Sequence, residues 1–489
     1  MKRLLVLSIV AFVLSVVGSG SLCAQTAAPV QAVKGPDERF KTDILVVVAH
    51  PDDEGGVTPY LARAIYDEHK RVAVVFATRG GSGGNDYSRE HGPALADIRE
   101  QEARAACAKL GITNVWFLLG KDTASQNVLN SLANWGHGAN LEGLVRIVRL
   151  TQPEVIITWL PGVFIGENHG DHQAAGVLAT EAFDLAGDPT AFPAQVAGAT
   201  KRLEVYLENL TLWQPKKLYY FSDADDQKQF AGTGPAYSIR EVSPSQKKPY
   251  WRLAIEAATP HLTQFPDVQQ LQKMTEEQLN KFFEDPKNMF WPDPMTLIFG
   301  KTAFGGAETR TMDVFGGERN APLPNQAPKI KVPNAANLPP GQTVESLPTY
   351  SGPSDGWVEI GGVWAFYKAF LAGHAISRFS SVKLELAVKS GSVVSIPFRL
   401  VPAHPNSRVV SISAELPSGW RVVSGDGSFE IPGNGPTELR VDVQTPELSK
   451  EALQNQKPVP ITLYLSTHGQ NFGEIGLHVL LKGNALPQN

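Results

Sequence analysis

The chain has 489 residues, of which 42% are hydrophobic and 19% are charged, and its formal net charge is −5. This length predicts two to four domains, and the composition is that of a globular protein with enough apolar residues for a buried core. An acidic chain offers no electrostatic basis for binding nucleic acid, so we expect no nucleic-acid partner.

The first 24 residues have the pattern of a secretory signal. Lys2 and Arg3 precede an apolar run over residues 4–17, and small residues follow it. We therefore expect residues 1–24 to be cleaved and the protein to be exported, to the periplasm or the outside of the cell. An uncleaved anchor and lipidation of Cys23 are the alternatives. Cleavage would remove two of the 44 basic residues and none of the 49 acidic ones, which leaves a net charge of −7.

After a polar stretch at residues 25–40, which we expect to be an exposed leader, strand-like and helix-like segments alternate. Strands are expected at residues 44–49, 71–77, 115–119, 155–160 and 217–221, and helices at 58–70, 93–110, 141–150 and 173–185. Strands that are apolar throughout and alternate with helices predict a Rossmann-like α/β fold, in which a parallel sheet carries helices on both faces. We assign residues 41–320 to this domain, with a helix at 276–283 and an extended segment at 295–304 as insertions or closing elements.

The last third of the chain has a different pattern. Residues 321–353 contain eight prolines among polar residues, which is typical of a linker, and we place that linker at 321–354. Region 355–489 then shows short strand-like runs at 393–401, 409–416, 438–443, 461–466 and 477–481. They predict an antiparallel β-sandwich. This region resembles the NEW3-like, Ig-type domains that are attached to bacterial carbohydrate-active enzymes. No segment after the signal is long and apolar enough to span a bilayer.

Two polar clusters follow strands of the predicted sheet. The string A-H-P-D-D-E at residues 49–54 ends the first strand, and H-G-D-H at residues 169–172 comes after the fourth. Ligands bind at the carboxyl ends of parallel strands, so both clusters fall where a site is expected. Histidine and aspartate are suitable zinc ligands, and three protein ligands leave a position for water in a catalytic site. The surplus acid and histidine are then available for proton transfer.

These two motifs resemble the PIG-L/LmbE-like family of zinc-dependent N-acetylglucosamine deacetylases, over residues 40–310. The resemblance implies a hydrolase that removes an N-acetyl group from an amino-sugar or an N-acetylglucosamine-containing glycoconjugate, with one Zn²⁺ or another divalent metal per chain. It implies that the metal ligands are His50, Asp53 and His172. It also implies that Asp52 is the general base, that His169 stabilises the oxyanion or protonates the leaving amine, and that Asp171 tunes His169.

Further segments fit the family pattern: T-R-G at residues 78–80, R-x-x-E at 99–102 and L-G-x-D at 119–122. There the resemblance implies that Arg99 and Asp122 help to hold the substrate. Judged on the residues alone, Arg99 and Glu102 are equally well explained as a solvated ion pair on a helix, and Asp122 as a turn residue. The segment H-L-T-Q at 261–264 resembles a late H-x-S-Q segment of the family, and the role of His261 stays open.

Two other functions are weighed against the deacetylase. Residues 80–84 formally match the G-x-S-x-G elbow of serine hydrolases, but no helix is predicted until residue 93, so we interpret them as a loop near the site. A non-catalytic carbohydrate-binding protein with a degenerate site is the second alternative, and the intact set of ligands, base and acid favours the enzyme. Cys107 has no cysteine partner after cleavage and is interpreted as a buried apolar residue. The oligomeric state is left open.

Overall fold

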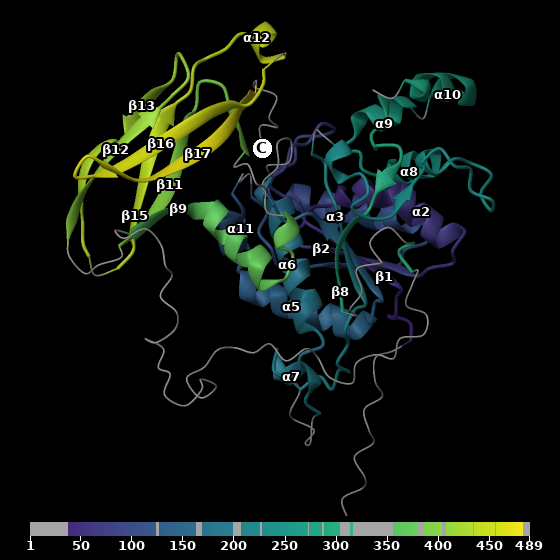
Figure 1. The fold of residues 1–489 in the computed structure, drawn as a ribbon. Coiled ribbons are helices and arrows are strands. Elements are labelled where there is room, and N and C mark those ends of the chain that lie inside the picture. The colour runs from purple at the N-terminus through teal and green to yellow at the C-terminus, as the bar shows by residue number, and fades with distance from the viewer. Residues whose placement is uncertain are drawn as a thin grey trace, which may run out of the picture.

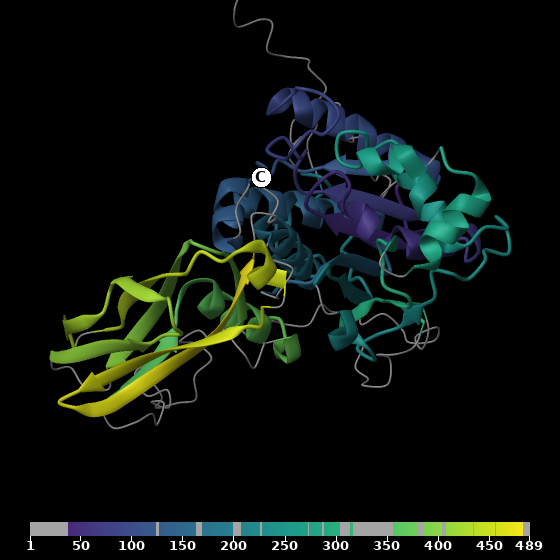
Figure 2. The same cartoon turned by 90° about the horizontal axis from the view of Figure 1, so that it is seen from above.

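The structure is a computed structural model that describes residues 38–123, 127–162, 169–198, 207–224, 227–271, 273–285, 288–303, 313–315, 356–379, 385–402, 407–433, 435–454 and 456–482. These residues form an α/β part and a C-terminal β part (Figures 1 and 2). The predicted signal peptide and linker, and nearly all of the leader, lie outside the described residues. Among the helices of the described residues, none is long and apolar enough to cross a membrane.

The α/β part is built on a six-stranded sheet with the order β3-β2-β1-β4-β5-β8. Its strands are β1 (Ile44–Val48), β2 (Val72–Phe76), β3 (Asn114–Phe117), β4 (Val155–Trp159), β5 (Lys217–Phe221) and β8 (Ile298–Thr302). The first five run parallel, which confirms the predicted strands and the Rossmann-like class. The extended segment predicted at 295–304 supplies β8, which pairs antiparallel with β5 and makes the sheet mixed.

Helices cover both faces of this sheet, as the strand sequences require. Strands β1, β2, β4 and β5 are buried at every residue, and such strands need cover on both sides. Right-handed crossovers put the helices between β1 and β3 on one face and those between β3 and β5 on the other. The main helices are α2 (Thr58–Tyr66), α3 (Pro93–Lys109), α4 (Val128–Trp135), α5 (His137–Thr151), α6 (Gly170–Leu185) and α8 (Tyr250–Ala258).

Four of these helices were predicted, and α4 and α8 were not. Helix α6 begins at Gly170, three residues before its predicted start, so the H-G-D-H motif lies at a helix N-terminus rather than in a preceding loop. The predicted helix at 276–283 is present as α10 (Glu276–Glu284), which Thr275 and Gln278 begin with a capping box. The shorter elements of this part are α7 (Pro193–Val196), α9 (Pro266–Leu271), β6 (Ala236–Tyr237) and β7 (Met295–Thr296).

The C-terminal part contains two sheets, with the orders β10-β17-β16-β12-β14 and β13-β15-β11-β9. Its elements are β9 (Gly356–Ile360), β10 (Glu385–Lys389), β11 (Val393–Pro402), β12 (Arg408–Glu415), β13 (Arg421–Ser424), β14 (Gly427–Ile431), β15 (Thr437–Gln444), α12 (Lys450–Gln454), β16 (Val459–Thr467) and β17 (Gln470–Lys482). All five predicted strands are present, and the pairs are antiparallel except for β10 with β17. Buried residues of both sheets form one apolar cluster.

Helix α11 (Gly362–Gly373) follows β9 but contributes to the core of the α/β part. Its Tyr367 is buried there, and the Tyr367 hydroxyl donates a hydrogen bond to Gln173 Oε1 of α6 at 2.7 Å. Just beyond the helix, His374 Nδ1 lies 2.6 Å from Asp184 Oδ2. The region after the predicted linker therefore supplies part of the first core as well as its own sheets, and Figure 1 shows α11 beside α6.

Candidate active site

Both polar clusters lie at the carboxyl ends of β1 and β4, neighbouring strands of the sheet. The strand order reverses between these two strands, which is where open α/β sheets bind ligands. A pocket of about 450 Å³ opens there. Every predicted metal ligand and substrate-binding residue lines it, and so do two of the three predicted catalytic residues: His50, Asp52, Asp53, Arg99, Asp122, His169 and His172.

Asp53 is held by three N–H donors. Its Oδ2 accepts hydrogen bonds from the backbone N–H groups of Ala49 and His50, both at 2.9 Å, and from Trp159 Nε1 at 3.0 Å. Its other oxygen, Oδ1, lies 3.2 Å from His172 Nε2 and 3.6 Å from His50 Nδ1. Burial opposes ionisation, but the charges of His172 and His50 hold the pKa of Asp53 well below its usual value. One oxygen of a fixed carboxylate is thus aimed between two imidazoles.

The second cluster is shaped by the start of α6. His169 is the N-cap, and its Nδ1 accepts a hydrogen bond from Asp171 N at 3.2 Å. The Asp171 carboxylate is fully buried and lies 3.3 Å from His50 Nε2, and it also accepts from Thr123 Oγ1 at 2.8 Å. Burial opposes its ionisation, yet the hydrogen bond with His50 lowers the pKa of Asp171 to about 2. The resemblance implies that Asp171 tunes His169, but the structure places the carboxylate against His50.

The three site histidines form a packed group. Their ring centroids lie 4.9 Å apart for His50 and His169, 4.8 Å for His169 and His172, and 5.3 Å for His50 and His172. The His172 ring stacks on Trp159, with centroids 4.1 Å apart and planes 4° apart. Burial, followed by the charges of His50 and His172, lowers the pKa of His169 to about 3, so this imidazole is neutral near pH 7.

The geometry of these side chains fits a divalent cation. Zinc with four ligands at about 2.0 Å places the ligand atoms about 3.3 Å from each other, close to the distances from Asp53 Oδ1 to the two imidazoles. Two groups in the described residues have ligand atoms that all lie within 4.8 Å of one another: His50, His169 and His172, and His50, Asp122 and Asp171; the set His50, Asp53 and His172 is not one of them. Asp53 competes with His169 as the third ligand. The fixed, anionic carboxylate favours Asp53, because Nδ1 of His169 is occupied by a backbone N–H.

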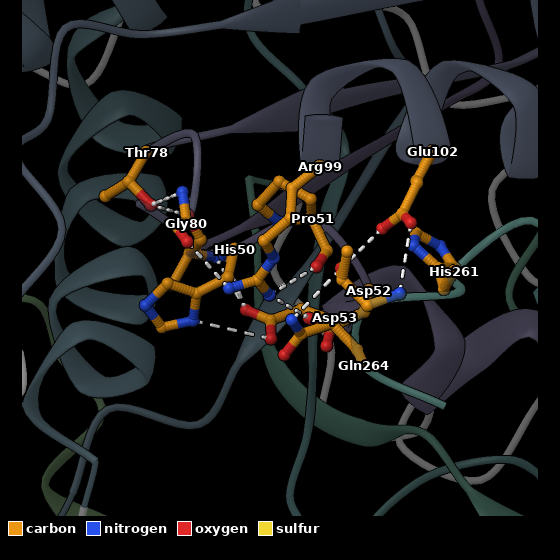
Figure 3. Close-up of polar contacts among 12 residues, drawn as sticks. His50, Pro51, Asp52, Asp53, Thr78, Gly80, Arg99, Glu102, His261 and Gln264 are labelled. Atoms are coloured by element: carbon orange, nitrogen blue, oxygen red, sulfur yellow. Dashed lines mark hydrogen bonds and ion pairs between the residues drawn. The ribbon is translucent and has the colours of Figure 1, made fainter. Parts of the chain in front are cut away.

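Arg99 reaches the site from α3. It is 4% exposed, its Nη2 lies 3.2 Å from Asp52 Oδ1, and it donates to the carbonyl oxygens of Pro51 at 2.7 Å and Gly80 at 2.9 Å (Figure 3). Burial raises the pKa of Asp52 to about 6, and the charge of Arg99 opposes this rise. Glu102 is buried and accepts two hydrogen bonds from Thr263. The alternative of a solvated Arg99–Glu102 ion pair is therefore wrong.

Asp122 lies inside the cluster. Its Oδ1 is 3.1 Å from His50 Nε2, and its Oδ2 accepts from Ser82 N at 2.6 Å. Asp122 is therefore part of the site, and the interpretation of Asp122 as a turn residue does not account for these contacts. The Ser82 hydroxyl donates to the Asp122 carbonyl oxygen at 2.8 Å rather than to a histidine. That arrangement does not provide the base that a serine nucleophile needs.

The opposite wall of the pocket was not predicted. It is apolar and comes from α8, the residue before α9, α9 itself and the segment after α10: Ile255, Phe265, Val268, Phe290 and Trp291. The Trp291 indole donates to the Gly55 carbonyl oxygen at 2.7 Å, which ties this wall to the first cluster. No local pattern marks these residues, because their place follows from the packing of distant segments.

Residues 45–183 match the model of the PIG-L family, described as GlcNAc-PI de-N-acetylase. The chain is 34% identical over 162 residues to 1D-myo-inositol 2-acetamido-2-deoxy-alpha-D-glucopyranoside deacetylase 1 of Frankia alni, covering 30% of this chain and 55% of that protein. It is 33% identical over 195 residues to the deacetylase of the same name from Frankia casuarinae, covering 36% and 57%. The chain thus spans little more than half the length of these two relatives.

The structure also aligns with N,N'-diacetylchitobiose deacetylase from Pyrococcus horikoshii. The alignment covers 53% of this chain and 82% of that one, at 20% identity and a TM-score of 0.36.

Proposed function

Residues 45–183 form a domain of the PIG-L family, and on this premise we propose that the protein is a metal-dependent deacetylase that hydrolyses the N-acetyl amide of an amino-sugar. One observation carries the proposal. The three proposed metal ligands, His50, Asp53 and His172, share a pocket with an additional carboxylate, Asp52, and an additional imidazole, His169. Amide hydrolysis needs both a cation and groups that move protons. The relatives are named as deacetylases of an acetamido-sugar conjugate, which is the chemical class we propose for the substrate.

A bound Zn²⁺ would supply Lewis acidity and would make a water molecule nucleophilic near neutral pH. Asp52 is the base in this proposal: its side chain is 17% exposed, its pKa is raised to about 6, and it lies beside the proposed ligand Asp53. A carboxylate with that pKa is ionised at neutral pH and can still accept a proton.

His169 is placed as the hydrogen-bond donor. Because its Nδ1 accepts from Asp171 N, the neutral ring carries its proton on Nε2. That N–H can stabilise the oxyanion, and the proton that Asp52 takes from the attacking water is then available for the departing amine. Arg99 fixes Asp52 through their 3.2 Å contact. We propose that Arg99 and Asp122 also border the bound sugar, because both line the pocket.

The proposal is tested by turnover on a panel of N-acetylated amino-sugars and their conjugates, with released acetate as the readout. We expect activity that is lost with a chelator and restored by Zn²⁺, and a zinc content of about one per chain. His172→Ala should lose zinc and activity together, while His137→Ala, a histidine that pairs with Glu181 on the α5–α6 surface, should keep both. Sugar binding without any turnover would instead support the carbohydrate-binding alternative.

We further propose that residues 1–24 export the protein and that the two C-terminal sheets pack as a β-sandwich. The signal-like sequence supports the first statement, and the apolar cluster shared by both sheets supports the second. N-terminal sequencing of the secreted protein would check the cleavage site. An intact N-terminus on a membrane-bound protein would favour the uncleaved anchor.

A further inference from the structure

The proposed mechanism gives no task to the buried carboxylate of Glu54. Glu54 is 4% exposed, directly follows the proposed ligand Asp53, and is neither a predicted ligand nor a lining residue of the active-site pocket. A carboxylate is costly to bury unless it is paired and hydrogen-bonded. Both of its oxygens do have partners: Oε2 accepts from the backbone N–H of Asp52 at 3.0 Å, and Oε1 lies 2.6 Å from His261 Nε2.

The backbone of Asp52 explains why such a bond matters. Asp52 has φ of 114° and ψ of −23°, a left-handed conformation that side-chain-bearing residues rarely adopt. Consecutive residues in a regular strand point to opposite faces. The turn at Asp52 lets its carboxylate meet Arg99 while that of Asp53 folds back onto Ala49 N and His50 N. The strained conformation is thus what brings two adjacent aspartates to one pocket in different roles.

His261 supports Glu54 from a segment far along the chain. It is 2% exposed and lies 207 residues away in the sequence. Its backbone is fixed at the end of α8, because His261 N donates to the Ala258 carbonyl oxygen and Phe265 N donates to that of His261. In Figure 3, His261 lies on the side of Asp52 away from His50. The contact therefore links the α8 region to the Asp52 turn without touching the predicted metal ligands.

We propose that Glu54 and His261 form a positioning pair that holds Asp52, through its backbone N–H, in the left-handed conformation that aims its carboxylate as the base. This role rests on the proposed function of Asp52. Neither residue of the pair touches the reacting atoms in this proposal; both act through Asp52. The late H-L-T-Q segment thereby acquires a role through His261, and the last residue of the A-H-P-D-D-E string acquires one through Glu54.

The first arm of the test uses the full-length, zinc-loaded protein and the best N-acetylated amino-sugar from the panel. Glu54→Ala should lower kcat by about tenfold or more, on the scale of general-base assistance, with KM and zinc content unchanged. Glu54→Gln keeps an oxygen that can accept from Asp52 N–H, so it should retain most of the activity. Thr263→Val is the matched control. Thr263 lies in the same segment as His261, and the change removes a buried hydrogen bond to Glu102 without touching Asp52.

A double-mutant cycle separates positioning from general damage. If the pair acts only through the Asp52 carboxylate, Glu54→Ala should have little further effect on kcat in an Asp52→Asn background. A full additional loss there would overturn the proposal, as would an unchanged kcat in Glu54→Ala. Because Glu54→Ala leaves His261 buried without its partner, Glu54→Ala/His261→Leu provides a second variant with an apolar pair should the first fail to fold.

The second arm does not depend on activity. Crystal structures of the zinc-loaded wild type and Glu54→Ala should show Asp52 leaving the left-handed region or losing its contact with Arg99 in the variant alone. An unchanged Asp52 in that variant would refute the positioning role even if the enzyme were inactive on every sugar. Conversely, Asp52 could be displaced in the variant although the wild type shows no turnover. That result would support the positioning role of Glu54 and His261 and reject the proposed function.

Discussion

At the scale of single residues, the site contains more candidate groups than a tetrahedral metal needs. Asp52 borders the proposed ligand Asp53 and contacts Arg99, and the His169 ring lies 4.8 Å from that of His172. We expect Asp52→Asn and His169→Gln each to lower kcat by about 10²-fold, as lost acid–base assistance does, and to keep their zinc. Zinc analysis and acetate release on the same samples check this.

Loss of zinc in one of these variants would change its assignment. His169 and His172 both belong to a group whose ligand atoms lie within 4.8 Å of one another, so His169→Gln is the sharper test. A zinc-free His169→Gln protein would make His169 a ligand in place of Asp53.

Gly80 shows how closely the site residues are packed. It has φ of +68°, and a Cβ there would lie 2.6 Å from the guanidinium carbon of Arg99. An alanine in a left-handed conformation lowers the free energy of unfolding by itself. We expect Gly80→Ala to lower it by about 2 kcal/mol beyond that, because the added methyl group overpacks the site. Gly136→Ala is the control, since Gly136 has φ of +67° and ψ of 63° and no neighbour within 4 Å of the Cβ position. The free energy of unfolding of both variants is measured by urea denaturation. An equal decrease in the two would mean that Arg99 moves aside freely.

At the scale of elements, Arg149 joins α5 to the end of α6. It is fully buried and donates to the carbonyl oxygens of Leu185, Ala186, Asp188, Ala191 and Phe192 and to Gln195 Oε1. One planar guanidinium thus adds side-chain hydrogen bonds to a turn in which the carbonyl oxygens of Leu185, Ala186, Asp188 and Phe192 also accept backbone N–H groups, and burial lowers the pKa of Arg149. We expect Arg149→Met to cost about 3 kcal/mol or more, because it removes several buried hydrogen bonds that a charged donor makes.

Arg146, on the same helix, provides the comparison. Its side chain is 39% exposed and pairs with Glu142 and Glu208. Surface pairs of this kind contribute about 0–1 kcal/mol, so Arg146→Met should unfold close to the wild type. If chemical denaturation gave the two variants the same stability, the buried network would not be the reason that α5 and α6 hold together.

At the scale of the whole molecule, α11 decides where the chain can be truncated without removing part of the α/β core. Its Tyr367, Phe370 and Leu371 pack in the α/β core, and Tyr367 bonds to Gln173, the residue after His172. We expect a chain of residues 1–379 to fold and bind zinc, and a chain ending at residue 320 to melt at a lower temperature. Zinc content and thermal melts of both truncations check this. If both melted alike, α11 would add nothing to the first core.

Much of the secondary structure of this protein follows from its local sequence. The runs at 44–49, 71–77, 155–160 and 217–221 are apolar at nearly every position, and such runs become buried strands regardless of detail. The two polar motifs follow directly from strand ends, so the position of the pocket could be predicted as well. The start of α6 was missed because its N-cap is a histidine, His169, rather than one of the usual capping residues.

Only the tertiary structure decided which side chain each polar group faces. Asp171 meets His50 across 121 residues, and Glu54 meets His261 across 207. Helix α11 joins a core that begins more than 300 residues earlier in the chain. A sequence pattern reports the burial and periodicity of a segment, but contacts between distant segments depend on how layers pack and where loops return. For this reason the motifs predicted which polar groups gather at the site, but they did not predict the partners that orient each group.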